Sequence, residues 1–148
     1  MLFRSTPMVY KTLFEEMDFR VLDVCCKEHV QEVLNDHPLK PGILPQSIVY
    51  MIDLTQSEEE LKKSRMEFQN WMAYLTKVYG KRNFEKTPVS ILYNKLDLNP
   101  EANLEEFKAQ FYIDHPLLKQ QAISVKKNIG LEQSFKWIVQ NIKVATKF

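Results

Sequence analysis

The chain has 148 residues, enough for one domain with a hydrophobic core and too few for two. Hydrophobic residues make up 45% and charged residues 26%, as in ordinary soluble globular proteins, and no apolar run is long enough to cross a bilayer. No transmembrane segment is therefore expected. The formal net charge of +1 excludes a chain that as a whole attracts nucleic acid or anionic lipid, so no nucleic-acid partner is expected either.

A hairpin is predicted first. Met8–Phe14 is rich in β-branched and aromatic residues, and Met17–Val24 alternates between two faces. The polar pair Glu15 and Glu16 separates the two segments, which is typical of a turn between antiparallel strands.

A loop and a buried strand are predicted next. Residues 25–46 are polar and interrupted by prolines, which indicates a loop with at most a short helix over residues 28–34. Ser47–Asp53 is a compact apolar run, as expected of a strand that is buried on both faces.

The two cysteines, Cys25 and Cys26, are adjacent within this loop. A disulfide needs a separation and an orientation that neighbouring residues seldom provide, and no CxxC pair indicates zinc. We therefore expect a reduced, intracellular and most simply cytoplasmic protein. Residues 1–14 carry Arg4 and Lys11 and no acid, so a mitochondrial or other organellar location is the alternative.

A long helix follows, from Ser57 to about Gly80. Ser57-Glu58-Glu59-Glu60 has the pattern of a capping box, in which the serine hydroxyl and Glu60 each satisfy a free amide of the first turn. Apolar residues at three-to-four and seven spacing predict one buried stripe. These residues are Leu61, Phe68, Met72, Leu75 and Tyr79.

The remaining elements alternate between strand and helix. Val89–Tyr93 and Gln121–Val125 are predicted strands, Asn103–Phe111 is a predicted helix, and a last helix begins at about Leu131. This order predicts a single α/β domain over residues 1–148, with a mainly parallel sheet and right-handed crossovers. The buried face of the last helix is expected to carry Leu131, Phe135, Ile138 and Ile142.

Polar residues follow two of these strands. Asn94-Lys95-Leu96-Asp97 comes directly after the strand at Val89–Tyr93, and Ser124-Val125-Lys126 comes at the end of the next strand. Parallel sheets bind their ligands at the carboxyl ends of the strands, so these two segments are the candidate site. The structural alternative is that they are turn residues and solvated lysines.

This pair of segments resembles the guanine-recognition motifs NKxD and SAK of small GTPases of the Ras/Arf type. The resemblance implies that Asp97 accepts two hydrogen bonds from guanine, that Asn94 ties the loops together, and that the Lys95 stem lies along the base. A backbone amide of the segment Ser124-Val125-Lys126 would donate to the keto oxygen of guanine. Adenine would leave these groups unpaired, which gives selectivity.

The resemblance covers roughly residues 8–142. Asp23 ends the hairpin, where the family has its DxxG magnesium motif, and Ser47–Asp53 is similar to the strand that follows. The closing helix, with Gly130 ahead of it, resembles the Arf-type end. The long helix and Thr87-Pro88 also resemble the signal-recognition-particle receptor β subunit.

Two departures from the family bear on activity. The phosphate loop, GxxxxGK followed by Ser or Thr, is absent from the sequence, and that loop supplies most of the phosphate binding on which catalysis depends. The DxxG glycine is also replaced, because Asp23 is followed by Val24, Cys25, Cys26 and then Lys27. We therefore expect no hydrolysis, no catalytic residue and no cofactor, with GDP or GTP as the open alternative and Asp23 as a possible remnant metal contact. The three histidines have no metal-ligand spacing and are expected on the surface or in loops: His29, His37 and His115.

The resemblance implies an incomplete Ras-like P-loop NTPase fold: a mostly parallel sheet with an antiparallel N-terminal hairpin, helices on both faces, and the first strand and phosphate loop missing. That strand lies centrally in the family's sheet, so its loss predicts an exposed apolar edge that invites partners. The expected function is a non-catalytic pseudo-GTPase, a structural or interaction subunit of a multiprotein complex. The alternative is a guanine-nucleotide switch whose phosphate-binding elements come from a partner or from coding sequence missing here.

Overall fold

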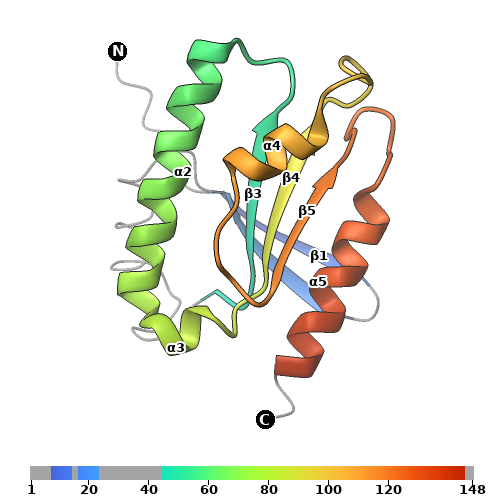
Figure 1. The fold of residues 1–148 in the computed structure, drawn as a ribbon. Coiled ribbons are helices and arrows are strands. Elements are labelled where there is room, and N and C mark those ends of the chain that lie inside the picture. The colour runs from blue at the N-terminus through green and yellow to red at the C-terminus, as the bar shows by residue number, and fades with distance from the viewer. Residues whose placement is uncertain (1–7, 15–16, 24–44, 146–148) are drawn as a thin grey trace, which may run out of the picture. The chain divides into compact units, whose positions relative to one another are not determined.

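The computed structural model describes residues 8–14, 17–23 and 45–145 (Figure 1), with the side chains of residues 45–142. The chain divides into two compact units, residues 1–44 and 45–148, and each is described by itself. The predicted helix at residues 28–34 lies outside the described residues, as do Cys25, Cys26, Lys27, His29 and His37. The expectation of a single domain stays a prediction.

The first unit contains the predicted hairpin. Strands β1 (Met8–Phe14) and β2 (Met17–Asp23) pair antiparallel, with Phe14 opposite Met17 at one end and Met8 opposite Asp23 at the other. The described part of the second strand ends one residue before the predicted boundary.

The second unit is a parallel sheet with helical crossovers. Its strands β3 (Ile48–Asp53), β4 (Val89–Asn94) and β5 (Leu118–Ala122) lie in the order β3-β4-β5. This arrangement, together with the hairpin, confirms the α/β class. Among the described residues, none of the helices combines the length and apolar character that crossing a bilayer requires. The helices are α2 (Glu58–Tyr79), α3 (Lys81–Phe84), α4 (Leu104–Gln110) and α5 (Leu131–Ala145).

Helix α2 begins and ends as its sequence predicts. The Ser57 hydroxyl accepts a hydrogen bond from the Glu60 amide at 3.2 Å, and the Glu60 carboxylate accepts one from the Ser57 amide at 2.9 Å. The helix ends before Gly80, whose φ of 76° is a conformation that favours glycine. The predicted stripe is buried except for Leu61, which is half-buried: Phe68, Met72, Leu75 and Tyr79.

Helices cover both faces of the parallel sheet. Rings on α2 and α4 pack against one face, where Tyr50 meets Phe68 at a centroid distance of 5.0 Å and Tyr93 meets Phe107 at 5.8 Å. The other face belongs to α5, because the Ser134 hydroxyl bonds Gln121 at 3.0 Å, and successive strand residues point to opposite faces. This confirms the predicted placement of helices on both faces.

The prediction that the Ser47–Asp53 strand is buried on both faces is wrong. Val49 and Met51 of β3 are 45% and 51% exposed, whereas Val89–Tyr93 in β4 is buried throughout. The reason is position: in the described sheet β3 is an edge strand, and α5 packs on the β5 side of its face. A run of apolar residues shows that a strand can be buried, but it does not show whether another element covers that strand.

The last strand begins earlier than predicted. The sequence indicated Gln121–Val125, but β5 is Leu118–Ala122. The polar start of the strand hid it, because Gln120 points into the core and donates from Nε2 to the Tyr93 hydroxyl at 3.1 Å and to the Lys108 carbonyl at 3.1 Å.

The buried face of α5 is rotated from the predicted one. Ile138 and Ile142 are buried as expected, but Leu131 and Phe135 are half-buried. Ser134 and Val139, both at most 1% exposed, are buried in addition. Ser134 was missed because it is polar, although its hydroxyl is satisfied by Gln121 and by the Gly130 carbonyl.

His115 lies in the segment before β5, in a loop as the prediction allowed, but it is buried and not on the surface. It is 8% exposed and packs edge-on against Phe84, at a ring-centroid distance of 4.9 Å. Its Nε2 lies 2.7 Å from the Phe84 carbonyl, and its Nδ1 accepts a hydrogen bond from the Leu117 amide at 3.0 Å. The ring is therefore the neutral tautomer with its proton on Nε2, and it links α3 to the segment before β5.

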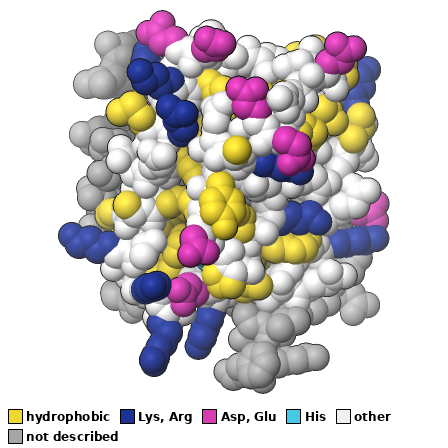
Figure 2. Space-filling view, viewed as in Figure 1, with side chains coloured by type: hydrophobic (Ala, Val, Ile, Leu, Met, Phe, Trp, Pro, Cys, Tyr) yellow, Lys and Arg dark blue, Asp and Glu magenta, His cyan; other side chains and the backbone are white. Residues whose placement is uncertain are grey.

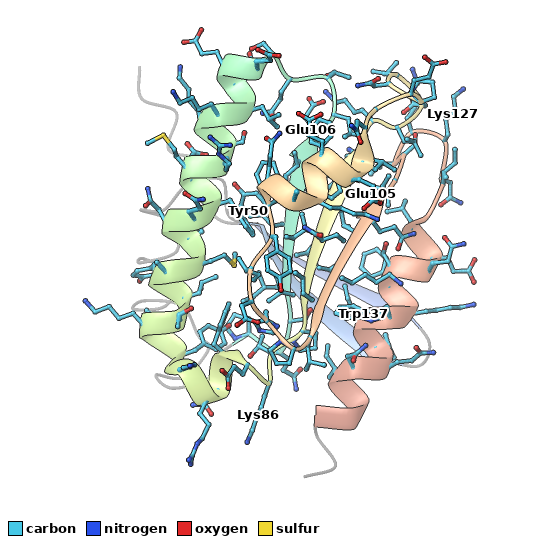
Figure 3. All side chains as sticks on the ribbon, in the orientation of Figure 1. Tyr50, Lys86, Glu105, Glu106, Lys127 and Trp137 are labelled. Atoms are coloured by element: carbon cyan, nitrogen blue, oxygen red, sulfur yellow. The ribbon has the colours of Figure 1, made fainter. Side chains whose placement is uncertain are left out.

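Figure 2 shows hydrophobic side chains over the middle of one face, with charged side chains both among them and at the rim. Figure 3 places Lys86 at the end of the unit opposite Lys127 and Glu106. The Lys86 end is basic, because the exposed residues Lys77, Lys81 and Arg82 lie close by in sequence. The opposite end carries the loops that follow the strands.

Candidate functional site

The loops after β4 and β5 meet at the carboxyl edge of the parallel sheet. Asn94 is the last residue of β4, and the Leu96 amide donates to the Ile123 carbonyl at 3.0 Å. Ser124 and Val125 follow one residue further along the second loop. The predicted site residues therefore come from two segments that the backbone itself holds together.

Two side-chain hydrogen bonds join these loops. The Asn94 Oδ1 accepts from the Val125 amide at 3.1 Å, and the Ser124 hydroxyl donates to Asp97 Oδ1 at 2.7 Å. Ser124 is fully buried, and its oxygen also accepts from the Lys127 amide at 3.1 Å. Both loops are thus fixed before any ligand binds. The structure brings together four of the predicted residues in this way: Asn94, Asp97, Ser124 and Val125.

The two predicted lysines are placed differently from each other. Lys95 is anchored, because its Nζ lies 2.6 Å from Asp53 Oδ2 in an ion pair between half-exposed side chains. Its φ of 70° is left-handed, which a non-glycine residue adopts seldom. Lys126 is exposed on the loop. Only the first lysine therefore has a position that the fold determines.

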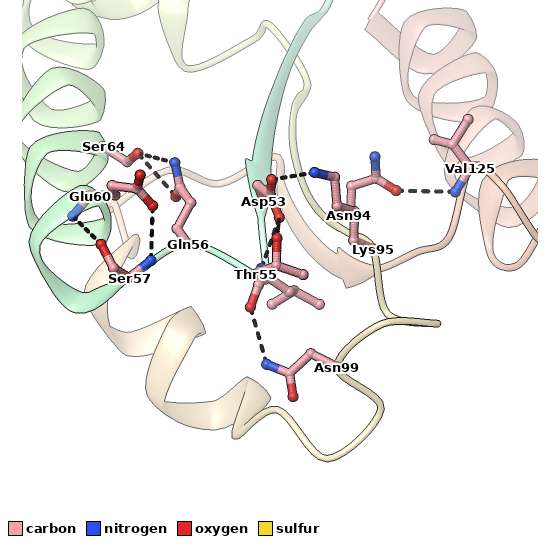
Figure 4. A network of polar contacts seen from close by, with 11 residues as sticks. Asp53, Thr55, Gln56, Ser57, Glu60, Ser64, Asn94, Lys95, Asn99 and Val125 are labelled. Carbon is pink, nitrogen blue, oxygen red and sulfur yellow. Dashed lines mark hydrogen bonds and ion pairs between the residues drawn. The ribbon is translucent and has the colours of Figure 1, made fainter.

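Asp53, the partner of Lys95, was not predicted as a site residue. Its second oxygen, Oδ1, accepts from the Thr55 amide at 2.8 Å and the Thr55 hydroxyl at 2.6 Å (Figure 4). Burial alone would raise the pKa of Asp53, but the hydrogen bonds from Lys95 and Thr55 and the lysine charge outweigh it and lower the pKa below its ordinary value. Asp53 pairs with Asn94 across the parallel strands, and that register is the signal that could have found it.

The loop after β5 owes its shape to a tight reversal. Ser124 and Ile129 form an antiparallel bridge, with backbone hydrogen bonds of 3.1 and 2.9 Å, and the chain turns between them. Gly130 then has a φ of 77°, and a Cβ built there would lie 2.9 Å from Gln121 Nε2 and 3.1 Å from the Ala122 carbonyl. Glycine is therefore required at this position both by conformation and by space.

No metal centre is found in the part of the chain that the structure describes, where no three His, Cys, Asp or Glu residues are placed to hold an ion. Asp23 is the last residue of β2, and its role as a remnant metal contact stays a prediction. What the loops offer chemically is one oriented carboxylate and one oriented amide at a half-exposed edge. Such a pair can bind a planar heterocycle that presents adjacent N–H donors.

Comparison with known proteins agrees with this geometry. A model of the ADP-ribosylation factor family (Arf) matches residues 5–142. A search of curated proteins finds no match. Since the family match spans far more than half of the chain, this chain belongs to the Arf family of small GTPases.

Proposed function

We propose that this chain is a non-hydrolysing member of the Arf family that acts by binding other proteins and that keeps a guanine-reading site. The observation that carries the base-binding part is the pre-formed pair of loops, in which Asn94 bonds the Val125 amide and Ser124 bonds Asp97. An arrangement fixed in advance loses little conformational entropy when it binds.

The hydrogen-bonding capacity of these loops fits guanine. Ser124 donates to Oδ1 of Asp97, so Oδ2 and the second lone pair of Oδ1 can accept from the ring N–H and the exocyclic amine. The Asn94 Nδ2 group can donate to the other edge of the base, since its Oδ1 is used by the Val125 amide. Adenine presents no such pair of donors at that edge and would leave the carboxylate unpaired.

Calorimetric titration of the purified chain with GDP and ADP tests base reading. We expect GDP to bind and ADP not to, and Asp97→Ala to abolish the preference for guanine. Glu132→Ala is a matched control, because it removes an exposed carboxylate on α5, where Glu132 pairs with Lys136. Binding of ADP as tight as that of GDP would contradict the proposal.

The lack of hydrolysis is proposed from the sequence. Phosphoryl transfer depends on positioning and on neutralising the phosphates, which the family achieves with the GxxxxGK loop. The three glycines of the chain, Gly42, Gly80 and Gly130, do not have that spacing. We expect no release of phosphate above background when the chain is incubated with GTP and Mg²⁺, and turnover by the purified chain would contradict this.

The role in binding other proteins is supported by β3. This strand has an unpaired edge in the described sheet, and Val49 and Met51 expose apolar side chains beside it. Natural proteins usually protect such edges with charges or proline, and none occurs within Ile48–Ile52. We propose that a partner protein covers this strand. Introducing lysine at Met51 should abolish co-purification of that partner without lowering the stability of the chain.

The second candidate is a guanine-nucleotide switch whose phosphate-binding elements come from a partner or from coding sequence outside the printed sequence. The hydrogen-bonded loops that support guanine binding in the first proposal support this second candidate to the same extent. Genomic or transcript sequence decides between the two, because an in-frame GxxxxGK segment upstream would support the switch.

A further inference from the structure

We propose that Asp53 is a positioning residue of the guanine site: by holding Lys95 and cancelling its charge, it makes the site select the guanine nucleoside rather than its phosphates. The inference rests on the base-binding role proposed above for the loops after β4 and β5. It adds a residue from a third strand end and a ligand class, guanosine, for which phosphates contribute little.

The carboxylate of Asp53 is fully oriented. Its Oδ1 accepts two hydrogen bonds from Thr55, at 2.8 Å from the amide and 2.6 Å from the hydroxyl. These bonds fix the plane of the carboxylate, and Oδ2 is left to meet Lys95 Nζ at 2.6 Å. A hydrogen bond between two charged groups at this distance is of the strong kind.

The backbone fixes Asp53 against the base-reading loop. Asp53 and Asn94 are register partners at the ends of neighbouring parallel strands, and the Leu54 amide donates to the Asn94 carbonyl at 3.0 Å. Asn99 closes the same junction from the other side, because its Nδ2 donates to the Leu54 carbonyl at 3.1 Å (Figure 4). The anchor for the lysine is therefore a strand end, and groups held on strands are more precisely placed than groups on loops.

The backbone of Lys95 is shaped to deliver its side chain to this anchor. Its φ is 70°, and its carbonyl accepts from the Leu98 and Asn99 amides at 3.0 and 3.2 Å. Such unfavourable conformations persist where the surroundings determine them, and they cluster at functional sites. The turn and the ion pair together hold the lysine in one orientation.

The ion pair decides what this lysine can do. An unpaired lysine is a mobile point charge suited to phosphate. With its Nζ held by Asp53, Lys95 offers its apolar methylene stem to a flat base, while its charge is compensated. Of the charged groups that described contacts hold at this edge, Asp97 is used for base recognition and the charge of Lys95 is compensated by Asp53, whereas Lys126 and Lys127 are exposed cations on the loop after β5. The charges held in place therefore favour the base over phosphate.

The test compares guanosine with GDP on the full-length chain by calorimetry. For the wild type we expect dissociation constants within about threefold of each other. Asp53→Ala should weaken guanosine binding by about threefold to fivefold, the range for a half-exposed ion pair, while GDP loses less because the freed lysine attracts phosphate. Asp53→Asn removes the charge and leaves one acceptor oxygen where Asp53 uses two, so it cannot satisfy both Thr55 and Lys95 and should shift the ratio toward GDP as Asp53→Ala does.

Glu132→Ala serves as the control, since it removes a carboxylate from an ion pair of 2.8 Å on α5 and should leave the ratio unchanged. The inference is overturned if Asp53→Ala leaves the guanosine-to-GDP ratio unaltered, which is what a purely structural role predicts. It is also overturned if the wild type binds GDP more than about threefold more tightly than guanosine. Failure of the wild type to bind either ligand is a separate result, because it refutes the proposed base site itself.

Discussion

Strands β3 and β4 are neighbours with similar apolar sequences, Ile48–Asp53 and Val89–Asn94, yet only β4 is buried along nearly its whole length. The two strands pair in parallel, residue by residue from Ile48 opposite Val89 to Asp53 opposite Asn94. β4 has a strand on each side and helices on both faces, whereas β3 is an edge strand that α2 covers on one face. Composition alone therefore does not determine how much of a strand is buried. The number of neighbouring strands and helices determines it.

The largest expected effect is a difference in stability between equivalent substitutions in β4 and β3. Ile91→Ala in β4 removes a fully buried side chain and should lower the free energy of unfolding by about 2–5 kcal/mol. Met51→Ala in β3, where the side chain is half-exposed, should change it by no more than about 0.5 kcal/mol. Urea unfolding of the purified chain measures both. Equal losses would mean that the exposed face of β3 is covered in solution.

A second effect concerns the connection that precedes β5. His115→Ala leaves the buried Phe84 carbonyl and the Leu117 amide without their side-chain partner, which should cost about 1–3 kcal/mol. The Leu117 carbonyl accepts from the Val89 amide at the start of β4, so the loss should spread to the central strand. Hydrogen exchange of the Val89 amide, compared with that of Ile48, would show this. A loss confined to α3 would contradict it.

A smaller effect weakens the helix that covers the buried face of β3. Ser57→Ala removes the hydroxyl that caps α2 and should cost about 1 kcal/mol, measured by thermal unfolding. Ser57→Asp should recover most of this loss, because a carboxylate can accept the same hydrogen bond and is favoured at a helix N-terminus. Equal melting temperatures for Ser57→Ala and the wild type would show that tertiary packing alone holds the first turn.

A last effect appears only at alkaline pH and is absent at neutral pH. Burial raises the pKa of Tyr50 to about 12 from its ordinary 10.0, and the Glu67 carboxylate adds to the shift. Since the folded state holds the phenol proton more tightly, its contribution to stability is complete below pH 10 and is lost as the pH rises toward 12. Tyr50→Phe should flatten this part of the pH–stability curve. An unchanged slope would show that the buried face of β3 is open to water.

The sequence predicted the long helix, the hairpin and the order of the parallel elements, because periodicity and capping are local properties. It failed at several positions where polar residues replace apolar ones in the core. Gln120 bonds to the Tyr93 hydroxyl and Ser134 bonds to Gln121, and neither interaction leaves a hydrophobic signal. The sequence placed His115 in a loop but gave no signal of its burial, which depends on its contact with the distant Phe84 carbonyl.

The candidate site was predicted in its two loops and missed in its third strand end. Asn94 and Ser124 were identified because each follows a strand in a recognisable motif. Asp53 has no motif of its own, and its pairing with Lys95 depends on the parallel register that brings Asp53 opposite Asn94. Whether the assembled loops bind guanine stays a prediction.

The bridge between Ser124 and Ile129 has a consequence for how this loop can evolve. Val125, Lys126 and Lys127 at its tip are exposed, so their side chains are free to diverge, whereas Asn128 has a φ of 54°, which restricts the residue types that fit there. The length of the loop cannot change in the same way, because Gly130 is fixed against β5 and the Val125 amide must reach Asn94. We expect related chains to vary in residue type at positions 125–127, to keep Asn, Asp or Gly at position 128, and to show neither insertions nor deletions within the tip.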